Sequence, residues 1–218
     1  ESFTLYLADK MGVAAEDISF DDETFRAAGS NLTPTFLEAA EMARVDGRGD
    51  LLVQEARVTL EARSFPNGAH VAEVEIDPET GKTVVDRYVV VDDFGNLINP
   101  LLAEGQVHGG VAQGLGQALC EHVVYDEDGQ LLTATFMDYA MPRAVDMPFV
   151  KFETEPVPST ANIMGMKGCG EAGTVGSMAA VANAVQDALW DRGVTQADMP
   201  FTPHRVWQML NDAPKAAE

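Results

Sequence analysis

The chain has 218 residues, of which 46% are hydrophobic, so it can bury a sizeable core in one or two domains. Its 35 acidic and 14 basic side chains give a formal net charge of −21 at pH 7. A charge of this sign and size repels nucleic-acid phosphates and anionic membrane surfaces, which argues against binding to either. No run approaches the roughly 18 apolar residues of a membrane span, and no secretory leader is visible, so we expect a cytoplasmic protein.

Cysteine usage indicates reduced thiols. Cys120 and Cys169 lie far apart, and neither stands at disulfide or metal-ligand spacing with a second cysteine or a histidine. The sequence therefore predicts no disulfide framework and no metal site built from protein side chains. Because Glu1 is the first residue and a helical pattern already starts at Ser2, we expect the chain to begin inside a longer protein.

Residues 1–50 are expected to form an N-terminal portion of mixed helix and strand. Thr35 and Glu38 have the spacing of a capping box, which predicts a helix start there, with Thr33 and Pro34 as an overlapping start. The predicted elements are a helix at 3–11, a hairpin with arms at 17–20 and 24–27, a helix from 34 or 36, and a turn at 46–50.

Residues 51–218 are expected to form a C-terminal domain of the α+β class. Turn sequences at 66–68 and 77–81 separate alternating apolar runs, which predicts a meander of antiparallel strands. Helices and a further hairpin are expected to pack with this meander. The predicted elements are strands at 53–62, 69–76 and 83–91, a helix at 101–119, hairpin arms at 123–125 and 131–136, a strand at 150–154, and helices at 177–191 and 203–211.

The segment 166–173 places one carboxylate, Glu171, among glycines just before a predicted helix. Glycine lets a ligand approach the main chain closely, and a helix start offers free N–H groups. A carboxylate set deep in such a loop is costly unless it is paired or used, so Glu171 is the candidate catalytic residue. The alternative is a carboxylate that caps the following helix.

Three short patterns suggest other ligands, and the surroundings of each argue against it. The string at 168–173 matches the dinucleotide fingerprint G-x-G-x-x-G, but no buried strand precedes it and no acid-bearing strand follows the helix. The triplet at 81–83 is similar to part of a phosphate-binding loop but joins two predicted strands. Residues 126–129 are similar to the start of a calcium loop, yet Met137 stands where its last carboxylate ligand belongs.

The glycine-rich helix predicted at 101–119 is the second informative segment. Each glycine inside a helix costs about 1 kcal/mol relative to alanine, so these glycines need a compensating gain, either close helix packing or a ligand. Gln106 and Gln113 lie on one face about two turns apart, and their amides suit a heterocycle such as a pterin. Spacing alone leaves both interpretations open.

Cys169 also has two interpretations. The glycines beside it and the nearby Lys167 could expose a reactive thiol, but no histidine lies near it in the sequence. The sequence favours a small packed side chain at this position.

Two motifs, in this order along the chain, carry a family resemblance. Residues 105–116 read GQVHGGVAQGLG and follow VVVDDFGNLINP at 89–100, while KGCGEAG at 167–173 precedes the alanine-rich run 179–189. Together they resemble the molybdopterin-binding subunit of the xanthine dehydrogenase, aldehyde oxidase and aerobic carbon monoxide dehydrogenase family. The bacterial carbon monoxide dehydrogenase large-chain type is the most similar. The resemblance covers essentially the whole chain, most securely residues 65–190.

The resemblance implies roles for individual residues. Glu171 matches the glutamate that stands beside the molybdenum and acts as the general base of a hydroxylation. Gln106 matches a glutamine that hydrogen-bonds the pterin system. The loop that contacts the cofactor is matched by Lys167, Gly168, Cys169 and Gly170. Cys169 departs from the family pattern, in which valine is common at that position.

The resemblance also implies a C-terminal molybdenum-cofactor-binding domain with a set of partners. The implied cofactor is molybdopterin with molybdenum, in its cytosine dinucleotide form, with iron–sulfur clusters and FAD on partner subunits or domains. The implied partners are the remainder of the molybdenum subunit, an iron–sulfur subunit, an FAD subunit and a small-molecule substrate. Subunits of this family are several times longer than this chain, so we expect the 218 residues alone to be inactive and to bind no cofactor tightly.

Two other functions stay open on the sequence alone. The chain could be a non-catalytic scaffold or assembly module that keeps the fold without the cofactor. It could also be a nucleotide-binding regulator that uses 168–173, in which case it would bind a free dinucleotide directly. The substrate is equally open, with carbon monoxide, purines, aldehydes and N-heterocycles as candidates.

Overall fold

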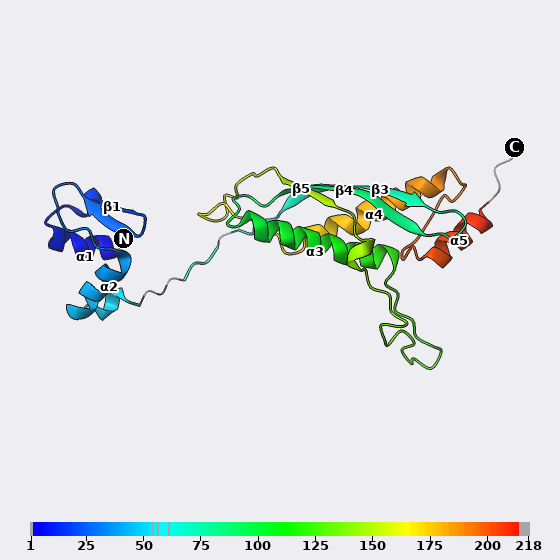
Figure 1. Ribbon diagram of the computed structural model, residues 1–218, viewed down its shortest axis with the longest axis horizontal. Helices are drawn as coiled ribbons and strands as arrows, with labels where there is room; N and C mark the ends of the chain where they lie inside the picture. The colour runs from blue at the N-terminus through cyan, green and yellow to red at the C-terminus, as the bar shows by residue number, and fades with distance from the viewer. Residues whose placement is uncertain (1, 54, 56, 61, 214–218) are drawn as a thin grey trace. The chain divides into compact units, whose positions relative to one another are not determined.

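The computed structural model describes residues 2–53, 55, 57–60 and 62–213 of the chain. Most of the predicted elements form, and the class is α+β, as the sequence predicts (Figure 1). The chain divides into two units, residues 1–59 and 60–218, and each unit has a hydrophobic cluster of its own. Among the helices of the described part of the chain, none is long and apolar enough to cross a membrane.

The first unit consists of two helices and a hairpin. Its elements are α1 (Ser2–Met11), β1 (Ile18–Asp21), β2 (Thr24–Ala27) and α2 (Phe36–Val45), with single 3-10 turns at Ala15–Asp17 and Gly49–Leu51. The predicted capping box forms: the Glu38 carboxylate accepts the N–H of Thr35 at 2.8 Å, and the Thr35 hydroxyl accepts the N–H of Glu38 at 3.2 Å. Helix α2 therefore begins at Phe36 rather than at Pro34.

The second unit contains a three-stranded sheet in the order β3-β4-β5. Strands β3 (Asn67–Ile76) and β4 (Thr83–Asp93) pair antiparallel, as predicted. Strand β5 (Val150–Thr154) pairs parallel with β4, an orientation that the sequence does not predict. Parallel neighbours need a long crossover connection, and here that connection contains helix α3 (Pro100–Leu119).

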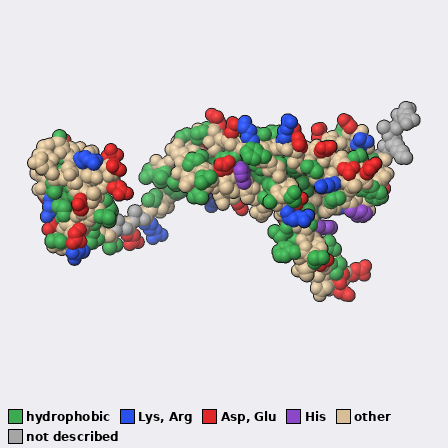
Figure 2. Space-filling view, in the orientation of Figure 1, with side chains coloured by type: hydrophobic (Ala, Val, Ile, Leu, Met, Phe, Trp, Pro, Cys, Tyr) green, Lys and Arg blue, Asp and Glu red, His purple; other side chains and the backbone are tan. Residues whose placement is uncertain are grey.

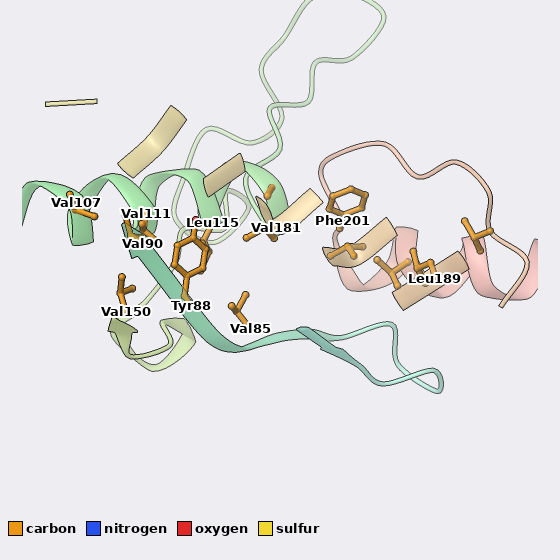
Figure 3. Close-up of a cluster of buried hydrophobic side chains, with 14 of the residues drawn as sticks. Val85, Tyr88, Val90, Val107, Val111, Leu115, Val150, Val181, Leu189 and Phe201 are labelled. Atoms are coloured by element: carbon orange, nitrogen blue, oxygen red, sulfur yellow. The ribbon is translucent and has the colours of Figure 1, made fainter. Parts of the chain in front are cut away.

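Helices α3 and α4 (Ala172–Trp190) cover one face of this sheet, and α5 (Pro203–Asp212) follows at one end of it (Figure 1). Alternate residues of β4, including Tyr88 and Val90, point from the sheet toward the helices and are fully buried (Figure 3). The other buried side chains labelled there are Val85, Val107, Val111, Leu115, Val150, Val181, Leu189 and Phe201. The core of the second unit therefore lies between the sheet and the helix layer.

Glycines bring α3 and α4 into backbone contact. A Cβ at Gly110 would lie 2.8 Å from the backbone nitrogen of Thr174, and one at Gly173 would lie 2.4 Å from the carbonyl oxygen of Val107. The Thr174 hydroxyl also donates to the carbonyl of Gly110 at 3.0 Å. By contrast, a Cβ at Gly109 would meet nothing within 4 Å. Close packing therefore explains Gly110 but leaves Gly109 without this explanation.

The hairpin predicted at 123–136 forms only at its turn. The connection after α3 leaves the body of the unit as a long arm (Figure 1), whose visible surface carries hydrophobic and acidic side chains (Figure 2). The N–H of Asp126 donates to the carbonyl of Gln130 at 3.0 Å, and one bridge joins Tyr125 to Leu131. The prediction of two strand arms is wrong, because no sheet or core among the described residues packs against an apolar face of the arm.

Two further predictions change in the structure. The strand predicted at 53–62 does not form in its described residues, 53, 55, 57–60 and 62, where Val53 and Val58 are exposed; the remaining three positions lie outside the described residues. Alternation alone does not make a strand without a partner strand. Helix α4 begins at Ala172, before the predicted start at 177. Gly173 has a low helix propensity, which argues against a helix there in the sequence, but its lack of a Cβ lets the first turn of α4 contact the backbone of α3.

Candidate functional site

Residues 166–171, here called the glycine loop, lie at the carboxyl end of β4 and are held there by backbone hydrogen bonds. The N–H of Lys167 donates to the carbonyl of Phe94 at 2.8 Å, and the N–H of Asn96 donates to the carbonyl of Gly165 at 3.0 Å. From Lys167 the loop continues directly into α4. The end of a strand and the start of a helix therefore position the loop from both sides.

Lys167 and Asp93 form a nearly buried ion pair beneath the loop. The Lys167 ammonium lies 2.5 Å from Asp93 Oδ2, and the two side chains are 11% and 12% exposed. Asp93 Oδ1 also accepts the N–H groups of Val157 and Gly95, both at 2.9 Å. The lysine first, and then these N–H donors, lower the pKa of Asp93 from 3.8 to about 2. The Lys167 side chain is therefore directed at Asp93.

Glu171 is the residue immediately before the first turn of α4. Its carbonyl accepts the N–H of Val175 at 3.0 Å, so it belongs to the helix as the N-cap residue. Its side chain makes no capping hydrogen bond, which disfavours the alternative of a structural cap. The residue is exposed in this chain rather than buried as the sequence suggests.

The other predicted contact residues lie around Glu171 in different settings. Gly168 and Gly170 are exposed: a Cβ at Gly168 would meet nothing within 4 Å, and one at Gly170 would meet only Gln106 Nε2, at 3.9 Å. The structure thus brings Gln106 of α3 against the glycine loop. Cys169 points the other way and packs against the hydrophobic cluster of the second unit, as a small packed side chain does.

A pocket of about 420 Å³ opens between this loop and the sheet. The loop and the first turns of α4 line it with Gly168, Gly170, Glu171, Ala172, Val175 and Gly176. The facing wall comes from β3, the residue before it and the end of β4, with Pro66, Asn67, Gly68, His70 and Asp92. Three of the predicted residues therefore meet in one pocket, and Gln106 borders one of them.

Asp92 is a pocket residue that sequence reasoning missed. Its side chain is 2% exposed, and Oδ2 has no hydrogen-bond partner among the described residues. It belongs to the inward-pointing set of β4, two residues after Val90 and four after Tyr88. That period-two pattern, continued one residue past the strand predicted at 83–91, is the signal that could have identified a buried carboxylate here.

His70 links Asp92 to a buried tyrosine. His70 Nε2 lies 3.5 Å from Asp92 Oδ1, and Nδ1 lies 2.8 Å from the hydroxyl of Tyr88. Burial, and to a smaller extent the negative charge of Asp92, raises the pKa of Tyr88, so its hydroxyl stays protonated and can donate. The three side chains therefore form a buried polar row along β3 and β4.

Two glycines make room for this row. Gly68 pairs with Asp92 across the sheet, and a Cβ there would lie 1.8 Å from Asp92 Oδ1. A Cβ at Gly176 of α4 would lie 2.4 Å from the ring of His70. A buried carboxylate and imidazole beside an open carboxylate are typical of functional sites rather than of a packed core.

The pocket offers oxygen acceptors, one imidazole and open backbone. No group of three or more His, Cys, Asp or Glu side chains within the described residues could hold a metal ion directly. The arrangement can instead receive a flat or partly anionic ligand along the glycines, and it presents the carboxylate of Glu171 to that ligand as a proton acceptor.

Comparison with known protein families gives one match over most of the chain. The molybdopterin cofactor-binding domain family matches residues 1–148. Among curated proteins, the chain is 35% identical over 207 residues to the gamma subunit of the 6-hydroxypseudooxynicotine dehydrogenase complex of Paenarthrobacter nicotinovorans, covering 92% of this chain and 26% of that protein. It is 40% identical over 149 residues to the carbon monoxide dehydrogenase large chain of Hydrogenophaga pseudoflava, covering 68% of this chain and 19% of that protein.

Solved structures give the same picture. Quinoline 2-oxidoreductase from Pseudomonas putida 86 superposes with a TM-score of 0.84 at 34% identity, covering 97% of this chain and 28% of that one. The Cu,Mo-CO dehydrogenase superposes with a TM-score of 0.83 at 30% identity, covering 95% of this chain and 27% of that one. The chain thus spans about a quarter of the length of these structures and of the gamma subunit.

Proposed function

Since this chain belongs to the molybdopterin-binding large subunits of the molybdenum hydroxylases, of the carbon monoxide dehydrogenase type, we propose that it supplies the general base and part of the cofactor site of such an enzyme. Glu171 is the proposed base. Gln106 and the loop of Lys167 to Gly170 are the proposed cofactor contacts. The activity belongs to the assembled subunit, and we propose that the 218 residues alone turn over nothing.

One observation carries this proposal. Glu171 stands at the N-cap of α4, lines the pocket and makes no capping hydrogen bond. A carboxylate at this position ordinarily stabilises its own helix by accepting an N–H of the first turn. Here the acceptor is left free at the mouth of a pocket, where it can take up a proton from a reacting group.

The residues present fit a molybdopterin. The Gly168 and Gly170 positions are open to close approach of a ligand, and the start of α4 has no side-chain cap, so its first N–H groups remain available to an anionic group. Gln106, beside Gly170, offers an amide donor and acceptor to a pterin edge. When bound, the cofactor supplies the oxidation and reduction of the hydroxylation, and this chain holds it and accepts a proton at Glu171.

Lys167 and Cys169 fit this proposal through the main chain. The ammonium of Lys167 binds Asp93 and the thiol of Cys169 packs on the core. We therefore expect the cofactor to meet the backbone of residues 167–170, and the two side chains to keep that backbone in place. We propose the cytosine dinucleotide form of the cofactor, whose phosphates suit the uncapped start of α4.

The proposed partners follow from the relatives. Their names describe a subunit of a complex and a large chain, which supports assembly with further subunits. We propose that these carry iron–sulfur clusters and FAD and accept the electrons, and that the substrate is a small molecule. The free thiols of Cys120 and Cys169 support a cytoplasmic location.

The test is the variant Glu171→Gln in the assembled enzyme. Removing a general base is expected to lower kcat by about a hundredfold or more, while the molybdenum and pterin content stays that of the unchanged enzyme. Glu75→Gln, on the exposed side of β3, is the matched control and should keep full activity. Unimpaired turnover in Glu171→Gln would refute the assignment of the base.

A further inference from the structure

The long arm after α3 comprises residues 121–139, and its two ends are joined (Figure 1). The Tyr139 hydroxyl donates to the Glu121 carboxylate at 2.7 Å. Helix α3 leaves room for this contact at Gly116, where a Cβ would lie 2.2 Å from Glu121 Oε1 and 2.8 Å from Cγ of Pro142. The body of the second unit is therefore shaped to hold the base of the arm.

The arm takes its course from polar contacts within itself. At its tip, Asp126 Oδ1 accepts the N–H groups of Asp128 at 3.0 Å and of Gln130 at 2.8 Å. Nearer the base, the Thr133 hydroxyl accepts the N–H of Val124 at 3.1 Å. Such contacts fix a chain locally without burying its side chains. A pair of extended segments without a packed face is marginal in water, so the arm needs a further surface to be stable.

Large apolar side chains of the arm face solvent. Phe136 is 86% exposed and Met137 is 93% exposed. The other large exposed apolar side chains of the arm are Val123, Tyr125 and Leu132. So many on one short segment are typical of an interaction site rather than of ordinary surface.

A cleft of about 460 Å³ continues this surface at the base of the arm. Leu115 and Leu119 of α3 line one part of it, and Met141 and Val145 of the chain that returns from the arm line another. Val145 is also exposed. The arm and the cleft together offer one apolar surface to an occupant.

The charge of the arm selects among possible occupants. The arm contains five acidic side chains and no lysine or arginine, and acidic side chains lie at its outer end (Figure 2). A second copy of a chain with a net charge of −21 would be repelled by it. The charge therefore favours a different surface, apolar and bordered by lysine or arginine.

The length of the relatives indicates where such a surface comes from. This chain spans about a quarter of the solved chains that it resembles, so most of such a subunit lies outside it. Strongly apolar contacts are typical of permanent interfaces rather than of exchangeable ones. A surface within the same subunit is the most permanent partner available to the arm.

We propose that the arm and the cleft at its base dock on the remainder of the molybdenum subunit, at an apolar surface bordered by lysine or arginine. This role rests on the proposed function, because that function assigns the chain to a larger molybdenum subunit. The docking surface is separate from the glycine loop. Gln106, which borders that loop, and Leu119, which precedes the arm, lie about 20 Å apart along α3.

Photo-cross-linking in the assembled enzyme tests the occupant. One variant carries p-benzoylphenylalanine in place of Met137, and the matched control carries it in place of Glu79, in the exposed turn between β3 and β4. Mass spectrometry identifies the linked peptides. Position 137 is expected to link to the remainder of the molybdenum subunit in several-fold higher yield than position 79.

Hydrogen exchange gives a second measurement that needs no variant. The amides of residues 134–138 are compared between the isolated 218-residue chain and the assembled enzyme. Their exchange is expected to be slower in the assembled enzyme by about tenfold or more, because covered backbone opens less often. The turn at 77–81 is the internal control and should exchange at the same rate in both.

Several results would overturn the inference. They are cross-links from position 137 to a second copy of the chain, to an iron–sulfur or FAD subunit, or to no protein, and equal yields from positions 137 and 79. Equal exchange of residues 134–138 in both samples would also overturn it, as would a linked segment of net negative charge.

Neither measurement involves turnover, so the two proposals fail separately. A covered arm together with a fully active Glu171→Gln enzyme would refute the proposed base alone. An uncovered arm together with an inactive Glu171→Gln enzyme would refute the docking surface alone.

Discussion

Lys167 stabilises the loop that carries the candidate base, and its charge is not free for an anionic ligand. The ammonium is 11% exposed and bound to Asp93, which also accepts two backbone N–H groups. This cluster connects the end of β4, the segment after β5 and the glycine loop. Its loss should therefore appear as a loss of stability rather than as a loss of phosphate binding.

The variant Lys167→Met tests this at the residue scale. It leaves the buried carboxylate of Asp93 without its cation, which is expected to lower the free energy of unfolding by about 2 kcal/mol at pH 7. Lys151→Met is the control, because the ion pair of Lys151 with Glu153 is exposed to solvent, and its loss should lower the free energy of unfolding much less than the loss of the Lys167–Asp93 pair. Urea unfolding of each variant measures both effects.

The same comparison has a defined pH dependence. The pKa of Asp93 is lowered on folding from 3.8 to about 2, so its stabilising effect is complete above about pH 4 and is lost as the pH falls toward 2. The difference between the unchanged chain and Lys167→Met should therefore shrink over that interval. A difference that stays constant from pH 5 to pH 2 would contradict the ion pair as its cause.

At this scale the sequence indicates candidate residues where a motif surrounds them, and their functional roles stay predictions. Glu171 and Gln106 stand out because glycines flank them, and the structure places both at the glycine loop. Asp92 and His70 were missed because they lie in different strands, and only the pairing of β3 with β4 brings them together. A contact between distant residues has no signature in the local pattern.

Helices α3 and α4 are joined by a contact that alanine would disrupt. At Gly110 a methyl group would meet the backbone of α4 at 2.8 to 2.9 Å, and backbone cannot move aside as a flexible side chain can. The helices carry much of the core between them, so their separation affects the whole helix layer. The low helix propensity of Gly110 is thus offset by the close packing of α3 against α4.

Gly110→Ala and Gly109→Ala form a matched pair at the element scale. Gly110→Ala should lower the free energy of unfolding by about 1–3 kcal/mol through overpacking. Gly109→Ala should raise it by up to about 1 kcal/mol, because the methyl group meets nothing within 4 Å and alanine favours helix. Thermal unfolding followed by circular dichroism compares them, and equal effects of the two changes would contradict the packing explanation.

Elements with strong local signals were predicted with nearly correct bounds, and elements that depend on partners were not. The capping box of α2 and the apolar alternation of β3 and β4 are local. The orientation of β5 depends on a crossover of more than fifty residues, from Asp93 to Val150. The arms at 123–125 and 131–136 have a strand-like composition, but no sheet or core in the described part of the chain packs against them.

The whole chain consists of two units with separate hydrophobic clusters, so we expect them to unfold separately. The first unit has fewer than 60 residues, a size at which a single core gives marginal stability. Both tryptophans, Trp190 and Trp207, lie in the second unit. Fluorescence therefore reports on the second unit alone, whereas far-ultraviolet circular dichroism reports on both.

Heating the full chain should give two transitions by circular dichroism, with the lower one silent in tryptophan fluorescence. A chain of residues 60–218 should keep the upper transition, with its midpoint unchanged within error. The opposite result is a single transition of the full chain at the same temperature by both probes, with a large shift of the midpoint in the chain of residues 60–218. That result would show that the two units unfold as one.

The direction of β5 decides where on the sheet a site can exist. Because β5 runs parallel to β4, both strands end on the same side of the sheet. There the N–H of Glu155 donates to the carbonyl of Asp92 at 3.1 Å. An antiparallel β5 of five residues would release the chain about 17 Å away. The loop would then have to return along the whole sheet before reaching Asp93. The direction of one short strand thus places Glu171 near Asp92. Reversing that direction would separate the two carboxylates, although neither residue would change.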